Sequence, residues 1–247
     1  MNILDSILRS TKAGRKMLVR LIDPDKFDAS TLCEGFGGPA TNRQRGECFD
    51  YYFVGGSTAE NCTEVVRVIH NACSTPVVLF PGSPAQFTPE ADALLFLTLM
   101  NSRDPRFLID QHIQSADDIV ASGIESIPMG YILVDGGRQS ATQQLTKAVP
   151  VPQQNTDDIV RLARAAMLLG KQLIYLEAGS GAKMPVSKDI IGAVRRAVNL
   201  PLIVGGGIRT VGEMSDAFVA GADIVVIGNH FEQHSDDIPL FLRNKPT

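Results

Sequence analysis

Short apolar segments recur along the chain, and a turn containing glycine, proline or aspartate follows most of them. Eight of these segments have the length and composition of buried strands. They are Met17–Ile22, Tyr51–Val54, Val77–Phe80, Leu94–Thr98, Tyr131–Val134, Leu173–Leu176, Leu202–Val204 and Ile224–Ile227. Segments with apolar residues at helical spacing lie between them, and the clearest are Asp157–Leu169, Ser187–Val198 and Thr210–Ala220.

This alternation predicts an α/β fold with a closed parallel sheet, the (β/α)₈ TIM barrel. A length of 247 residues suits one such barrel, so we expect a single domain over residues 1–247. An open, doubly wound sheet is the alternative. Three segments depart from the alternation. Cys33–Cys48 is an excursion before the second strand, Pro84–Pro89 predicts an irregular crossover after the third, and Arg138–Asn155 has the length of an active-site flap.

Composition and charge narrow the class of protein. Hydrophobic content of 44% and charged content of 20% are ordinary for a globular protein. A net charge of −4, without a Lys/Arg cluster, argues against a nucleic-acid partner. Cys33, Cys48, Cys62 and Cys73 form no CxxC pair and indicate reduced thiols rather than a zinc site. The first residues lack a signal-peptide core, and the apolar run Ala93–Met100 is too short to span a bilayer, so we expect a soluble, cytoplasmic protein.

Glycines after the last three predicted strands indicate a phosphate site. In a TIM barrel the carboxyl ends of the strands meet on one face, where the loops form the active site. The three loops are Ala178–Gly181, Gly205–Gly207 and Gly228–Asn229. Glycine lets backbone N–H groups approach an anion without a Cβ in the way. Ser180 adds a hydroxyl, and Thr210–Glu213 has the pattern of a capped helix start nearby.

Two residues at the first strand ends are candidate metal ligands. Asp23 is either the cap of a turn or a hard oxygen ligand for Mg²⁺, an ion that typically takes one or two carboxylates plus water and substrate phosphates. Ser57 is either the N-cap of the following helix or a second ligand. The four histidines show no metal-ligand spacing.

Glu177 is the best candidate for a general base, because it is a carboxylate at a strand end beside a phosphate loop. The alternative is an ion pair with Lys183 or Lys188. Asn101 and Asp135 also follow strands and complete the candidate site.

Six stretches now stand out: LIDPDK (Leu21–Lys26), VGGSTAE (Val54–Glu60), IPMGYILVDGG (Ile127–Gly137), IYLEAGSGA (Ile174–Ala182), VGGGIRT (Val204–Thr210) and IGNHFE (Ile227–Glu232). Together they resemble the geranylgeranylglyceryl phosphate synthase family over most of the chain. The combination of LIDPDK, GGST and YLEAGSG is specific, whereas VGGGIR with IGN occurs in many phosphate-binding barrels.

The resemblance implies a Mg²⁺-dependent prenyltransferase that makes an ether-lipid precursor. Such an enzyme joins a hydroxyl of sn-glycerol 1-phosphate to a polyprenyl diphosphate, here expected to be geranylgeranyl diphosphate, and releases diphosphate. Asp23 and Ser57 would bind the metal, and a homo-oligomer with transient membrane contact for the lipid product is expected. The glycerol phosphate site would comprise Tyr175, Leu176, Glu177, Ala178, Gly179, Ser180, Gly181, Gly206, Gly207, Gly228 and Asn229.

Leu21 separates this chain from part of that family. Some members carry a lysine two residues before the metal-binding aspartate, where Leu21 stands here. Arg20 is no substitute, because adjacent strand residues point to opposite sides. The chain therefore resembles a subgroup without this lysine. Phe80–Phe87 and Ala93–Met100 are the expected walls of the prenyl groove.

Two other functions stay open on the residues alone. A sugar-phosphate isomerase would share the glycine loops and would need an acid–base pair, such as Asp23 with a partner near Asp135. A non-catalytic barrel that binds a phosphate ligand or a lipid is the second, and Asp23 with Glu177 argues against it.

Overall fold

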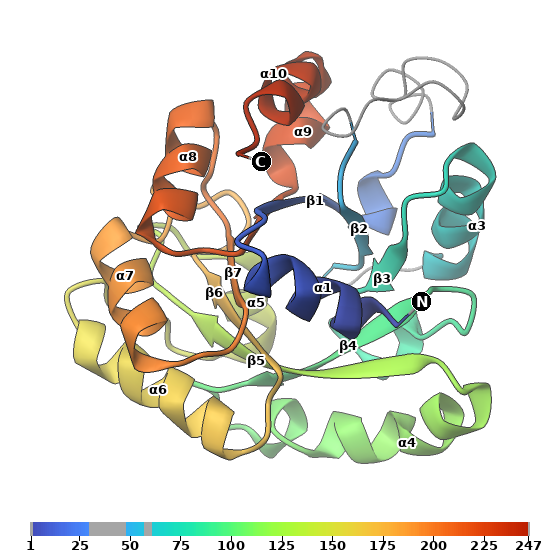
Figure 1. The fold of residues 1–247 in the computed structure, drawn as a ribbon. Coiled ribbons are helices and arrows are strands. Elements are labelled where there is room, and N and C mark those ends of the chain that lie inside the picture. Colours follow the sequence, from blue (N-terminus) through green and yellow to red (C-terminus); the bar gives the residue numbers. More distant parts are fainter. Residues whose placement is uncertain (1, 30–47, 57–60, 247) are drawn as a thin grey trace.

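Eight parallel strands form a closed barrel in the part of the chain that the computed structural model describes, residues 2–29, 48–56 and 61–246 (Figure 1). The last strand pairs with the first, with Val226 opposite Val19, which excludes the open-sheet alternative. The strands are β1 (Met17–Ile22), β2 (Tyr51–Val54), β3 (Val77–Leu79), β4 (Ala93–Leu99), β5 (Glu125–Leu133), β6 (Leu173–Glu177), β7 (Leu202–Gly205) and β8 (Ile224–Ile227).

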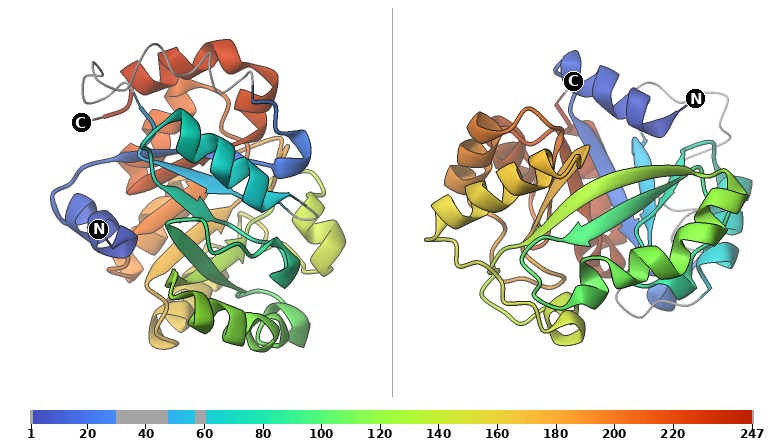
Figure 2. Two further views of the ribbon diagram at one scale, coloured as in Figure 1. Left: turned by 90° about the vertical axis from the view of Figure 1, so that its right-hand side faces the viewer. Right: turned by 90° about the horizontal axis from the view of Figure 1, so that it is seen from below.

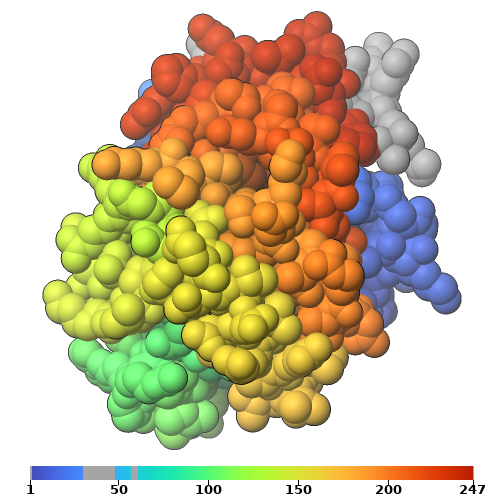
Figure 3. Space-filling view, turned by 90° about the vertical axis from the view of Figure 1, so that its left-hand side faces the viewer, coloured from blue at the N-terminus to red at the C-terminus, as the bar shows by residue number. Residues whose placement is uncertain are grey.

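Helices surround the barrel, and α6, α7 and α8 pack side by side on the face in Figure 3. Between β3 and β4 the described residues form only the short 3₁₀ helix η3 (Pro84–Gln86), which confirms the irregular crossover. The helices are α1 (Ile3–Lys12), α3 (Cys62–Ala72), α4 (Asp110–Ser122), α5 (Ala141–Thr146), α6 (Thr156–Leu168), α7 (Lys188–Ala197), α8 (Val211–Ala220), α9 (Asn229–Gln233) and α10 (Ile238–Arg243). No helix in the described ranges is long and apolar enough to cross a membrane.

Strand β5 begins six residues earlier than the apolar pattern predicts. Pro128 and Gly130 interrupt the pattern, since both residues usually weaken or end strands. In the structure Pro128 pairs with Phe96 of β4. A Cβ on Gly130 would lie 2.6 Å from the Cβ of Ala166, so the glycine lets α6 approach the strand closely. The close contact with α6 therefore explains why a glycine lies within this strand, which the local pattern does not predict.

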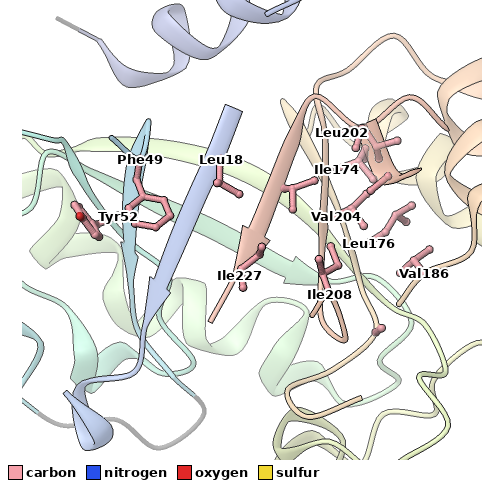
Figure 4. Close-up of a cluster of buried hydrophobic side chains, with 14 of the residues drawn as sticks. Leu18, Phe49, Tyr52, Ile174, Leu176, Val186, Leu202, Val204, Ile208 and Ile227 are labelled. Carbon is pink, nitrogen blue, oxygen red and sulfur yellow. The ribbon is translucent and has the colours of Figure 1, made fainter. Parts of the chain in front are cut away.

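The buried side chains of the described residues form two clusters, one inside the barrel and one between barrel and helices. Alternate strand residues divide between them. Figure 4 shows part of the outer cluster, including Leu176, Val186 and Val204. On β1, Leu21 packs with the inner cluster and lines the site described below, whereas Arg20 is buried on the other side, near Tyr52. Arg20 does not replace the missing lysine.

Helix α1 closes the amino-terminal end of the barrel, and the right-hand view of Figure 2 shows it opposite α5. Ile3 and Ile7 are buried with the inner cluster. The Glu125 carboxylate accepts hydrogen bonds from the Ile3 N–H at 2.5 Å and the Leu4 N–H at 2.9 Å. These two donors have no partner within the helix itself, so Glu125 holds the helix start on the barrel.

Glu125→Ala is expected to lower the free energy of unfolding by about 1–2 kcal/mol, because it leaves the two N–H groups of α1 without their acceptor. Urea unfolding followed by circular dichroism measures this change. Glu125→Gln keeps an acceptor oxygen, so its free energy of unfolding should fall by less than that of Glu125→Ala. Equal stability of the alanine variant and the native chain would contradict the capping role.

Candidate active site at the carboxyl ends of the strands

One large pocket of about 540 Å³ opens at the carboxyl ends of the strands, on the face of the barrel opposite α1. Residues from both halves of the barrel line it. Helix α5 covers part of it through Ala141, Thr142, Leu145 and Thr146. The segment predicted to be an active-site flap therefore contributes a short helix to the pocket wall.

The glycine loops after β6, β7 and β8 form one wall of this pocket, as the sequence predicts. We call five of its residues the glycine cradle: Ser180, Gly181, Gly206, Gly207 and Asn229. The N–H groups of Gly181, Gly206 and Gly207 donate no hydrogen bond within the described part of the chain. The Ser180 hydroxyl donates to the Asn229 side-chain oxygen at 3.0 Å. Free backbone donors that converge on a half-buried pocket wall favour a bound anion.

Glu177 lies on the barrel side of the cradle, with 6% of its surface exposed. Burial raises the pKa of its carboxyl from 4.5 to about 7, although the Gly179 N–H donates to it at 2.6 Å and favours the charged form. The predicted ion-pair alternative is wrong, because Lys188 instead pairs with Asp216 and no ion pair involves Glu177 in the described residues. A carboxyl with a pKa near neutrality can take up a proton during a reaction at physiological pH.

Aromatic rings form the floor of the pocket beside this carboxyl. The rings of Phe80 and Tyr175 are stacked with centroids 5.3 Å apart, and Tyr131 lies 5.3 Å from Tyr175. The Tyr175 hydroxyl is buried beside Glu177 and makes no hydrogen bond of regular geometry within the described residues, although its approach favours the charged form of the Glu177 carboxyl. A buried polar atom without a well-formed hydrogen bond is costly, so this hydroxyl favours a group that approaches both it and Glu177.

Asp23 faces the same pocket from the end of β1. Its Oδ1 atom accepts from the Asp25 N–H at 3.2 Å, which confirms the capping role. Its Oδ2 atom lies 2.9 Å from the Lys26 Nζ, and Lys26 also lies 3.4 Å from Glu232. Asp23 therefore caps a turn and also presents a carboxylate to a cation at the pocket wall. The described residues contain no group of three His, Cys, Asp or Glu side chains that would hold a metal alone.

The pocket lining is apolar along the crossover after β3 and along β4, and we call this part the apolar arm. Both predicted groove segments contribute to it, through Phe80, Pro84 and Phe87 in the first and Leu94–Leu97 in the second. The irregular crossover after β3 thus provides part of a wall where a regular barrel would place a helix. An elongated apolar ligand fits this arm, while its polar end would lie near Asp23 and the cradle.

Several predicted site residues do not face the pocket. Leu176 points outward into the cluster of Figure 4, because strand side chains alternate, and Ala178 packs in that same cluster. Gly179 does not line the pocket either, and its N–H is used by Glu177. The structure therefore does not place Leu176, Ala178 and Gly179 on the lining of this pocket, and their contact with glycerol phosphate stays a prediction. Ser57 lies outside the described residues.

Two other predicted residues have structural roles. The Asn101 side chain donates to the carbonyl oxygens of Leu133 and Val149 and accepts from the Leu133 N–H, so it joins the end of β5 to the following segment. Asp135 is exposed, accepts from the Gly137 N–H at 2.8 Å and does not line the pocket. Asp135 therefore does not supply, in this pocket, the partner for Asp23 that served as the example for the isomerase alternative.

Sequence reasoning did not assign Tyr131 and Arg209 to the pocket, although both line it. Tyr131 stands at the start of the predicted strand Tyr131–Val134, whereas it lies near the carboxyl end of the longer β5. Arg209 joins two loops, since its guanidinium donates to the carbonyl oxygens of Ala182, Lys183 and Gly207. Nothing in the local pattern distinguishes this arginine from an exposed one.

Comparisons with known proteins agree with this geometry. The PcrB family model matches residues 14–242. A geranylgeranylglyceryl phosphate synthase of Zunongwangia profunda is 44% identical over 93% of this chain and 97% of its own length. A geranylgeranylglyceryl phosphate synthase of Spirosoma linguale is 42% identical over 95% of this chain and 93% of its own length. The crystal structure of (S)-3-O-geranylgeranylglyceryl phosphate synthase from Thermoplasma acidophilum, in complex with its substrate sn-glycerol-1-phosphate, superimposes with a TM-score of 0.88 at 30% identity, covering 99% of this chain and 98% of that one.

The family match covers the barrel from before β1 to within α10, and the relatives match the chain over nearly their whole length. The chain therefore belongs to the PcrB family.

Proposed function

We propose that this protein is a polyprenylglyceryl phosphate synthase, a prenyltransferase that joins sn-glycerol 1-phosphate to a polyprenyl diphosphate, with geranylgeranyl diphosphate as the expected donor. The observation that carries the proposal is the arrangement within one pocket: free backbone N–H donors beside a buried carboxyl with a pKa of about 7, opening into an apolar arm. The relatives bear the matching name, and the Thermoplasma structure holds the matching substrate.

The reaction follows from the placement of these groups. The glycine cradle holds the phosphate of the acceptor, which orients its 3-hydroxyl toward the barrel axis. The Glu177 carboxylate, with the Tyr175 hydroxyl beside it, is the group that we propose accepts a hydrogen bond from that substrate hydroxyl. The hydroxyl oxygen then attacks the allylic carbon, the bond from that carbon to the diphosphate oxygen breaks, and Glu177 receives the proton. The faces of the Tyr175 and Phe80 rings suit the partial positive charge on the allylic carbon.

Mg²⁺ is the metal we propose for this site, because the Asp23 carboxylate is the kind of ligand that Mg²⁺ prefers. Mg²⁺ is commonly held by one or two carboxylates, with water and substrate phosphates completing the shell. Asp23 already pairs with a cation, the Lys26 ammonium, at the pocket wall. When bound, the metal supplies positive charge that stabilises the leaving diphosphate. Asp23 contributes a fixed carboxylate, held in place by its bond from the Asp25 N–H.

Asp23→Asn is expected to lower kcat at least about 100-fold and to raise the Mg²⁺ concentration for half-maximal rate, because it removes a charged oxygen ligand. Asparagine can still accept the Asp25 N–H, so the turn is kept. Asp135→Asn is the matched control, since Asp135 caps a similar turn outside the pocket. An unchanged Mg²⁺ titration for Asp23→Asn would show that the residue acts only as a cap.

The test of the proposed function is a product assay. The purified protein is incubated with sn-glycerol 1-phosphate, Mg²⁺ and prenyl diphosphates of graded length, and products are identified by mass spectrometry. We expect a prenylglyceryl phosphate with equimolar diphosphate. Absence of an ether product with every chain length would overturn the proposal.

A further inference from the structure

The turn after β5 is held against the glycine cradle on both sides of Arg138. The Gly136 carbonyl oxygen accepts from the Lys183 N–H at 2.8 Å, in the loop that follows β6. Four residues after Gly136, the buried Ser140 packs on the same loop, since a Cβ on Gly179 would lie 2.6 Å from the Ser140 Cβ. The segment that carries Arg138 is therefore fixed relative to the cradle.

Arg138 itself reaches the cradle at its Gly181 side. It lines the pocket. A Cβ on Gly181 would lie 3.7 Å from the Arg138 Nη1 and also 3.7 Å from the Asn229 Nδ2. The guanidinium, the side-chain amide and the free N–H of Gly181 thus border the same space, and all three are hydrogen-bond donors.

Among the described residues, Arg138 also differs from the other lysine and arginine residues of the pocket in having no partner. Lys26 and Arg106 form ion pairs, and Arg209 donates to backbone carbonyl oxygens. In the described ranges Arg138 forms neither an ion pair nor a hydrogen bond, although it is an exposed charge beside an anion-binding wall. A guanidinium presents paired N–H groups that match two oxygens of a phosphate.

The pKa of the Glu177 carboxyl is set by groups other than Arg138. The groups that shift the pKa of Glu177 are its burial, the Gly179 N–H and Tyr175, and Arg138 is not one of them. We therefore expect an interaction made by Arg138 to act at the phosphate end of the acceptor rather than in proton transfer at Glu177.

From these observations we infer that Arg138 is a phosphate-binding residue, which contacts the phosphate of sn-glycerol 1-phosphate at the Gly181–Asn229 side of the cradle. The inference rests on the proposed function for the identity of the substrate. Arg138 supplies acceptor affinity, so its loss affects the KM for the acceptor and spares kcat.

The test compares three variants by isothermal titration calorimetry with sn-glycerol 1-phosphate and, separately, inorganic phosphate. Arg138→Met is expected to weaken the Kd for both probes by about 10- to 100-fold, the usual loss for a hydrogen bond to a charged group. Arg138→Lys keeps the charge but not the paired N–H groups, so its Kd should lie between that of the native chain and that of Arg138→Met. Lys183→Met is the matched control, because Lys183 is an exposed cation on the neighbouring loop that does not line the pocket. Its Kd should change by less than about threefold, as expected for screened surface charge.

Kinetic measurements complete the test. Arg138→Met should raise the KM for sn-glycerol 1-phosphate, while kcat, its pH profile and the KM for the prenyl diphosphate stay near the native values. A native Kd in Arg138→Met, a loss no larger than in Lys183→Met, or a change confined to the KM for the prenyl diphosphate would each overturn the inference. Thermal unfolding verifies that each variant is folded.

The two proposals fail separately. Weakened binding of inorganic phosphate by Arg138→Met, in a protein that makes no ether product, would leave the arginine assignment standing and overturn the proposed function. An ether product, together with unchanged phosphate binding in Arg138→Met, would leave the proposed function standing and overturn the arginine assignment.

Discussion

Glu177→Gln is expected to lower kcat by about 10²- to 10⁴-fold, because it removes the proton acceptor while keeping the shape of the side chain. Glutamine retains an oxygen that can accept the Gly179 N–H, so the loop after β6 should stay in place. The Kd for sn-glycerol 1-phosphate, measured by calorimetry, should therefore change little. A variant with near-native kcat would exclude Glu177 as the base.

The pH dependence of kcat gives an independent check of the same residue. Burial raises the pKa of Glu177 to about 7, and only the ionised form accepts a proton. At saturating concentrations of both substrates, kcat should therefore fall as the pH decreases below about 7 and level off above it. A bound phosphate would move this midpoint upward, since a nearby negative charge disfavours ionisation. The acid limb should disappear in Glu177→Gln; its persistence there would assign the titration to another group.

Gly206→Ala is expected to lower kcat/KM for sn-glycerol 1-phosphate by at least about 100-fold, because small displacements of catalytic groups have effects of this size. Gly206 has a φ of +81°, which disfavours any residue with a Cβ. The added Cβ would collide with the Glu177 Oε1 and lie 2.7 Å from the Gly179 nitrogen. The substitution thus displaces both the base and the loop that supports it.

Gly212→Ala is the matched control for this substitution. Gly212 lies in α8, where a Cβ would meet only the Thr210 Oγ1 at 3.8 Å, an ordinary contact. It should leave kcat/KM unchanged and slightly stabilise the helix. Activity of Gly206→Ala equal to that of Gly212→Ala would contradict the close packing of the cradle against the base.

The barrel could be predicted from the sequence because each strand pairs with its neighbours in chain order and is buried on both faces. Continuous apolar runs such as Ile224–Ile227 are therefore a reliable signal. The capping box of Thr210 and Glu213 was equally local, and it forms as predicted. Strand β5 was cut short because the reason for Gly130, close contact with α6, is not local.

Part of the site could also be predicted from the order of the strands in the barrel. Asp23 and Glu177 were found because topology alone places strand ends on one face. Leu176 was included because a motif names consecutive residues, whereas a strand presents only every second side chain to the pocket. The raised pKa of Glu177 depends on burial and on neighbours far apart in the chain, and so does the absence of a partner for Arg138 among the described residues; no local pattern contains either.

In the proposed reaction, the hydroxyl oxygen of glycerol phosphate becomes the ether oxygen of the product. An isotope experiment with sn-glycerol 1-phosphate labelled with oxygen-18 at the 3-hydroxyl, a prenyl diphosphate and Mg²⁺ follows this oxygen by mass analysis of both products. The mechanism predicts full retention of the label in the prenylglyceryl phosphate and none in the released diphosphate. Label in the diphosphate, or no ether product at all, would contradict it.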